Sequence, residues 1–190
     1  MEIKRAIDLG DNVSEKLSEL YVDVFFDDGL KYFSKDRAKL KKAFSYVFLP
    51  ENIYVAMIDN EIVGMIACIG RGPFCMNFWR RGFFKHMGII KGLFTYFAFK
   101  KYSKISQNLD EDTALVEFVS TSPQHQRKGI ASNLMKYLFT LPQYKIFVLE
   151  VADTNPKVFE LYKKLGYKEL YRKKIIPKSG INYWIQMKYI

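Results

Sequence analysis

The sequence contains few of the residues that build metal centres or disulfide frameworks. Its 190 residues include two cysteines, Cys68 and Cys75, and two histidines, His86 and His125. These residues are not spaced as the paired ligands of a zinc site, and a chain of this length buries roughly 70% of its unfolded surface without covalent staples. We therefore expect no metal and two free thiols, as is usual for a cytoplasmic protein.

Long hydrophobic runs and linkers are also missing. The most apolar stretch, residues 92–99, is flanked by Lys91 and Lys100 and is far shorter than the ~20 residues that cross a bilayer. The N-terminus has no apolar core of signal-peptide length. No repeat, low-complexity tract or linker rich in Pro, Gly or Ser divides the chain, so we expect one cytoplasmic domain over residues 1–190.

Acidic residues are scarce in one segment of an otherwise ordinary globular composition. Thirty Lys and Arg against twenty Asp and Glu leave a net charge of +10. Residues 70–104 contain no acidic residue. The same segment carries eight basic ones: Arg71, Arg80, Arg81, Lys85, Lys91, Lys100, Lys101 and Lys104. Such a charge balance favours anionic partners.

Hydrophobic periodicity predicts a mixed order of strands and helices. Apolar residues at helical spacing indicate helices over 13–26 and 34–47, the second with Ser34 as its N-cap. A strand at 1–7 and a hairpin around Asp59 and Asn60 belong to the first half of the chain. A second strand pair, 167–174 and 182–189, encloses a turn at 177–180.

The centre of the chain alternates strand, helix, strand and helix, at 114–121, 129–140, 145–151 and 156–165. The short joints imply a right-handed crossover and two parallel strands. Both helices then begin at the carboxyl edge of those strands, which is the edge where open α/β sheets bind ligands.

The first of these joints has the form of a pyrophosphate site. It reads Gln-Arg-Lys-Gly-Ile-Ala over residues 126–131. Gly129 permits a tight turn, and the N–H groups that open the following helix favour an anion. The joint lacks the Gly-Lys-Ser/Thr run of a P-loop and the three glycines of the dinucleotide fingerprint. The alternative is a simple strand-to-helix turn with solvated Arg and Lys.

The second joint places Asn155 at a helix start, followed by Pro156, a residue favoured there. Val158 and Tyr162 are four residues apart and share a helix face. Tyr162 is either a core aromatic residue or a residue that faces a site.

Together these two motifs resemble those of the GNAT superfamily of acyl-CoA-dependent N-acetyltransferases. The resemblance covers residues 113–170 closely and residues 1–70 through element order. It implies an α/β (α+β) fold with a mixed, mainly antiparallel sheet, helices on both faces and a splayed parallel pair at the centre. It also implies acetyl-CoA as co-substrate, with Tyr162 as the general acid for the departing thiolate. The implied contacts with CoA are Phe118, Val119, Ser120, Thr121, Gln126, Arg127, Lys128, Gly129, Ile130, Ala131, Ser132, Asn155, Val158, Phe159 and Tyr162.

Direct transfer also needs a group that takes a proton from the attacking amine, because a primary amine of pKa near 10 is mostly protonated at neutral pH. Glu117 is our candidate general base. Strand alternation predicts that it shares a face with Val119 and Thr121. Glu150 on the neighbouring strand is a rival, and a purely structural carboxylate is the alternative.

The basic segment forms an aromatic-rich insert at about 71–104. Phe83, Met87, Ile90, Phe94 and Phe97 follow a helical stripe, although three glycines weaken the helix and could divide it in two. In the resembling family this region often helps to wall the acceptor site. A cationic wall predicts an acceptor that is neutral or anionic apart from its reacting amine, and disfavours polyamines, aminoglycosides and lysine-rich tails. Packing of the aromatic residues on the domain is the favoured alternative for the insert, and contact of a basic amphipathic helix with an anionic membrane surface is a less favoured one. The helical stripe and the lack of a recognised RNA or DNA module disfavour nucleic acid, and the aromatic-rich insert leaves a homodimer open.

The sequence thus predicts an N-acetyltransferase that moves an acetyl group from acetyl-CoA to a primary amine of a small molecule or peptide by direct attack. The alternative is a catalytically silent regulatory domain that binds CoA or acyl-CoA. The identity of the acceptor does not follow from the sequence.

Overall fold

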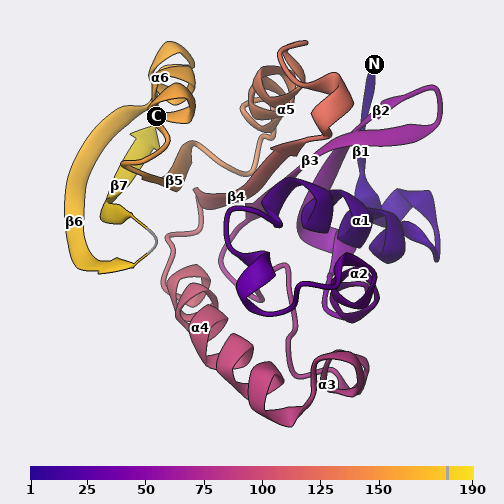
Figure 1. Ribbon diagram of the computed structural model, residues 1–190. Helices are drawn as coiled ribbons and strands as arrows, with labels where there is room; N and C mark the ends of the chain where they lie inside the picture. Colours follow the sequence, from indigo (N-terminus) through magenta and orange to yellow (C-terminus); the bar gives the residue numbers. More distant parts are fainter. Residues whose placement is uncertain (179) are drawn as a thin grey trace.

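Seven strands form one mixed sheet in the computed structural model (Figure 1). The structure describes residues 1–178 and 180–190, and all of their side chains except those of residues 98, 99, 101–103 and 176–178. The order across the sheet is β1-β2-β3-β4-β5-β7-β6, and every neighbouring pair is antiparallel except β4 and β5. The strands are β1 Glu2–Arg5, β2 Ile53–Ile58, β3 Glu61–Ile69, β4 Thr113–Thr121, β5 Ile146–Ala152, β6 Lys168–Lys178 and β7 Ile181–Tyr189. The predicted fold class is confirmed.

Helices cover both faces of this sheet. They are α1 Val13–Phe25, α2 Arg37–Phe44, α3 Arg81–Met87, α4 Ile89–Gln107, α5 Ile130–Leu138 and α6 Pro156–Lys164. One hydrophobic cluster lies under α1, α2 and α3, and a second lies under α5 and α6. Because both faces of the sheet carry apolar residues, a layer of helices must cover each face and exclude water. The sheet edges and the strand ends stay uncovered, and a site can form there.

The hairpin between β2 and β3 forms as predicted. Ile58 pairs with Glu61, and the two turn residues, Asp59 and Asn60, have φ values of 49° and 64°. Positive φ at both central residues is the geometry of a type I′ turn, in which Asp and Asn are among the favoured residues.

The second helix is shorter than predicted. It begins at Arg37, and its N-cap is Asp36, whose Oδ1 accepts a hydrogen bond of 3.0 Å from the Lys39 N–H. Ser34, the expected cap, instead accepts a bond from the Asp36 N–H and forms the turn before the helix. The prediction of Ser34 is wrong because both residues are good caps and the sequence does not show which one the helix uses.

The crossover from β4 through α5 to β5 also forms as predicted and makes the parallel pair. That pairing is short: residues 113–115 of β4 pair with residues 146–148 of β5. Beyond Leu115 and Val148 the two strands run on without pairing, while β5 continues along β7 as far as Ala152. The predicted splayed pair at the centre of the sheet is thus confirmed.

The insert consists of α3 and α4, divided at Gly88, whose φ is 77°. The predicted division is confirmed, but the predicted continuous stripe is wrong. Phe83 is buried in the core, whereas Ile90 and Phe94 are largely exposed. The left-handed turn at Gly88 redirects the chain, so residues that would share one face of a straight helix no longer do so. The side chains of Phe99 and Lys101 lie outside the described residues.

The insert has apolar residues that are exposed to solvent. These residues are compatible with contact with a membrane and with a homodimer, and both of these stay predictions. No helix in the part of the chain described here has the length and apolar character needed to cross a bilayer.

The C-terminal strand pair joins β5 through β7 and forms the edge of the sheet through β6. The predicted turn at 177–180 includes Ser179, which lies outside the described residues.

We expect the packing of α5 on the sheet to be a main source of stability. Leu134 is fully buried against the sheet, so Leu134→Ala should lower the free energy of unfolding by about 2–5 kcal/mol. Lys136→Ala, an exposed change on the same helix, should alter it by less than about 0.5 kcal/mol. Urea unfolding followed by circular dichroism measures both. Equal effects would contradict the described packing.

Candidate active site

A bulge in β4 shapes the region where β4 and β5 separate. Met65 of β3 pairs with Ser120, and Ala67 pairs with Glu117, so Phe118 and Val119 together lie opposite the single residue Ile66. Phe118 has a φ of 53°. An extra residue in one strand bends that strand and increases its local twist, which turns β4 away from its parallel neighbour.

Aromatic packing holds Phe118 in this conformation. Its ring lies 5.3 Å from Tyr21, 5.9 Å from Phe74 and 6.5 Å from Phe25, each at a steep angle. A left-handed backbone costs a bulky residue about 1–3 kcal/mol. Aromatic pairs of this kind contribute about 0.5–1.5 kcal/mol each beyond burial, so three of them offset the strain.

The bulge also changes which side chains share a face. Glu117 lies opposite Ala67, on the face covered by α1, whereas Val119 packs against the cluster under α5 and α6. The prediction that Glu117 shares a face with Val119 and Thr121 is therefore wrong, because the extra residue reverses the alternation between positions 117 and 119.

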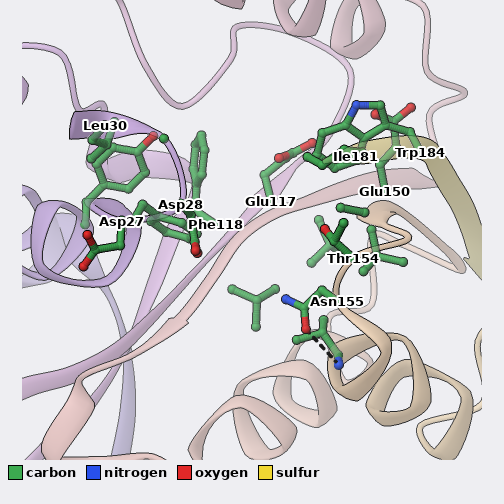
Figure 2. A pocket seen from close by; sticks show the side chains of 18 of the residues that line it. Asp27, Asp28, Leu30, Glu117, Phe118, Glu150, Thr154, Asn155, Ile181 and Trp184 are labelled. Carbon is green, nitrogen blue, oxygen red and sulfur yellow. Dashed lines mark hydrogen bonds between the residues drawn. The ribbon is translucent and has the colours of Figure 1, made fainter. Parts of the chain in front are cut away.

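A cavity of about 670 Å³ opens between the separated strands (Figure 2). Its walls come from the loop after α1, from β4 and β5, from the start of α6 and from β7. The lining residues are Tyr21, Phe25, Asp27, Asp28, Gly29, Leu30, Tyr32, Phe33, Val116, Glu117, Phe118, Val119, Glu150, Val151, Ala152, Thr154, Asn155, Val158, Tyr162, Ile181 and Trp184.

Six of the predicted site residues meet at this cavity. They are Glu117, Phe118, Val119, Asn155, Val158 and Tyr162, and the rival base Glu150 joins them. Thr121, the 126–132 loop and Phe159 lie outside the lining. Ser120 is buried, and its hydroxyl has no hydrogen-bond partner among the described residues. The roles of all these residues remain predictions.

The loop before α5 presents backbone N–H groups to solvent. Gly129 is the N-cap with a φ of 77°, and no described side chain caps the helix. Arg127 also has a positive φ, of 62°, and residues 126–129 are exposed. A helix start that is exposed, uncapped and preceded by two cations is a favourable place for a phosphate group.

The start of α6 orients the residues that reach the cavity. Asn155 caps this helix, its Oδ1 accepting a 3.4 Å hydrogen bond from the Val158 N–H, and Pro156 follows as the first helical residue. One turn further, Tyr162 lies on the same face as Val158 and also lines the cavity. Phe159 points elsewhere, with Lys163 Nζ 5.7 Å from its ring centre.

The surroundings of Tyr162 keep its side chain a neutral phenol. It is 6% exposed, and burial raises its pKa well above the usual value of about 10, with the negative charge of Glu117 raising it further. A phenol in this state keeps its proton throughout the neutral range, so it can donate that proton to a developing anion.

The two thiols are free and buried, and neither lines the cavity. Burial raises the pKa of Cys68 to about 12, and burial together with the charge of Glu117 raises that of Cys75. The expectation of two free thiols is confirmed. A thiol that stays protonated and away from the cavity is a poor nucleophile, which favours direct transfer over a covalent acyl-enzyme.

The described part of the insert supplies none of the residues that line this cavity. No described side chain of residues 71–104 is among the lining residues, and the ionisable lining residues that carry charge are all carboxylates. The predicted cationic wall is absent from the described lining, although Lys91 Nζ donates a 2.9 Å hydrogen bond to the carbonyl oxygen of the lining residue Phe33. The acceptor preference that followed from this wall gains no support from the described lining. No motif in the sequence indicates that the loop after α1, with Asp27 and Asp28, lines the gap.

A mixed sheet with a splayed parallel pair, an exposed helix start after the first of these strands and a cavity at their divergence is typical of acyltransferases of the GNAT class. The acetyltransferase (GNAT) family model matches residues 14–167. The chain belongs to this family.

Solved structures of other acetyltransferases have a similar fold. An N-acetyltransferase from Staphylococcus aureus Mu50 matches with a TM-score of 0.62 and 16% identity, over 100% of both chains. A ribosomal-protein-alanine N-acetyltransferase from Brucella melitensis matches with a TM-score of 0.60 and 15% identity, over 100% of this chain and 99% of that one. No curated protein sequence matches the chain.

Buried thiols should be slow to react. At pH 8 a pKa of about 12 makes the Cys68 thiolate about a thousandfold scarcer than a pKa of about 9 would. We expect Ellman's reagent to label both cysteines fully in urea and neither within minutes in the native protein. Rapid native labelling of either thiol would contradict the described burial.

Proposed function

We propose that this chain is an N-acetyltransferase that moves the acetyl group of acetyl-CoA to a primary amine of a small molecule or peptide by direct attack. The observation that carries the proposal is the placement of Tyr162. This buried, protonated phenol lines the cavity between the separated strands, at the same sheet edge as the uncapped start of α5. We also propose that residues 1–190 act as one domain in the cytoplasm, where buried free thiols are stable.

The described residues fit coenzyme A. The N–H groups of residues 129–132, with Arg127 and Lys128, suit its diphosphate. The unpaired side of β4 from Phe118 to Thr121 suits the amide groups of its pantetheine arm, because strand N–H and C=O groups without partners are costly when dry. When bound, acetyl-CoA supplies an acetyl group activated as a thioester.

Glu117 and Tyr162 move the two protons of the reaction. Glu117 takes the proton of the amine nitrogen as the new N–C bond forms. Tyr162 gives its proton to sulfur as the C–S bond breaks. The influence of Glu117 on the pKa of Tyr162 supports their working in one site. Glu150 lines the same cavity and remains the rival for the first role.

Loss of the Tyr162 phenol should slow the reaction moderately. A thiol of pKa about 8.5 is already a fair leaving group, so we expect Tyr162→Phe to lower kcat by about 10–100-fold at pH 7–8. Because the pKa of Tyr162 is raised, the wild-type rate should show no loss from its ionisation as pH rises to 9. Thiol release from acetyl-CoA with an amine measures both.

Tyr171→Phe, an exposed tyrosine on β6, is the matched control and should keep the wild-type rate. Full activity of Tyr162→Phe at every pH would contradict the general-acid role. Binding of CoA without thiol release to any amine would favour the silent regulatory domain.

Removal of charge before α5 should weaken CoA binding. We expect Arg127→Gln and Lys128→Gln each to raise the Kd of CoA by about 3–10-fold, and the effect to shrink in high salt. Lys136→Gln, later on the same helix, is the control and should leave the Kd unchanged. Isothermal titration calorimetry measures these values. Equal Kd values for all three variants would contradict the diphosphate site.

A further inference from the structure

The charged residues that line the cavity all have one sign. Asp27, Asp28, Glu117 and Glu150 line it, and no Lys or Arg whose side chain the structure describes does so. This is unexpected in a chain with a net charge of +10. The insert comes close to the cavity where Lys91 Nζ donates a 2.9 Å hydrogen bond to the carbonyl oxygen of the lining residue Phe33. No described basic group of the insert lines the cavity itself, and mobile ions screen charges beyond about 8–10 Å. The cavity therefore attracts cations.

Two of these carboxylates have no ion-pair partner in the described part of the chain. Asp27 lies 3.6 Å from Lys31 Nζ and 3.5 Å from an Arg37 nitrogen, which offset its charge. Asp28, at the exposed rim, and Glu150, half-buried, lie within 4 Å of no described basic group. Negative charge in a partly dry cavity without a counter-ion favours a cationic ligand.

The carboxylates are spread along the cavity. Figure 2 shows Asp27 and Asp28 beside Leu30 on one side, Glu117 between, and Glu150 with Trp184 on the other side. Among residues 1–178 and 180–190, no three His, Cys, Asp or Glu side chains form a group that could hold a metal ion. Separated carboxylates suit an extended ligand with separated positive charges. An indole such as that of Trp184 also attracts ammonium groups.

Tyr162 independently points to a ligand in this cavity. More than nine-tenths of its surface is buried, and its hydroxyl makes no hydrogen bond to any described residue. The hydroxyl is not one of the fully buried atoms without a partner, and Tyr162 lines the cavity, so a molecule bound there can accept its hydrogen bond.

From these observations we infer that the acceptor is a linear amine with at least two positive charges. This inference rests on the proposed acetyltransferase function. One amine loses its proton to Glu117 and attacks the acetyl carbon, while a distal ammonium stays charged and binds Asp28 at the rim. The products are the mono-acetylated amine and free CoA thiol.

A pair of matched acceptors tests the inference. We expect kcat/KM for 1,5-diaminopentane to exceed that for 1-aminopentane, which lacks the distal charge, by about tenfold or more at low salt. Added salt should reduce this ratio. Asp28→Asn should reduce it several-fold through the KM of the diamine. Asp11→Asn, exposed and outside the cavity, is the control and should leave the ratio unchanged.

A ratio near one, or an unchanged ratio in Asp28→Asn, would overturn the inference while leaving the acetyltransferase function intact. Neutral peptide amines that outperform the diamine would do the same. If no amine releases thiol, the proposed function fails instead. Calorimetry of the CoA-loaded chain with the diamine then decides the binding claim: saturable binding weakened by Asp28→Asn supports a cationic ligand, and no binding rejects it.

Discussion

The separation of β4 from β5 is the constraint on which the rest of the site depends. The two strands pair only as far as Leu115 and Val148, and the bulge at Phe118 turns β4 away from its neighbour. Backbone groups along the open side of both strands need partners that the sheet no longer supplies. The aromatic contacts of Phe118 with Tyr21, Phe25 and Phe74 hold this costly backbone in place. Core packing under α1 thus maintains a gap that a peptide-like ligand can fill.

Charge is divided between two sides of this gap. Backbone N–H groups and basic side chains gather where α5 begins, and carboxylates line the cavity from the loop after α1 to β5. An anionic donor and a cationic acceptor would each meet complementary charge, and each would be repelled from the other's place. Tyr162, which lines the same cavity, is a neutral acid, because burial and Glu117 both oppose its ionisation. The net charge of the whole chain therefore does not indicate the local charge on either side of the gap.

Local signals predicted most of the fold and the two helix starts to which we assign a role in donor binding. The Asp59-Asn60 turn, the Gly129 joint and the Asn155-Pro156 helix start each depend on neighbouring residues, so the sequence displays them directly. The acceptor side depends on contacts between distant segments. The Phe118 bulge reverses the side-chain alternation without any Gly to mark it, and the loop with Asp28 folds over a strand almost ninety residues away. The break at Gly88 was visible, but the direction of α4 after it was not.

Hydrogen–deuterium exchange of the whole chain with and without CoA tests the central claim most directly. The unpaired side of β4 and the first turn of α5 present exchangeable N–H groups in the free protein. If the gap holds the donor, CoA should slow exchange at residues 116–121 and 129–132 together, and should leave the hairpin of β2 and β3 unchanged. Slowed exchange at the α3–α4 insert alone, or no slowing at a saturating CoA concentration, would contradict the account.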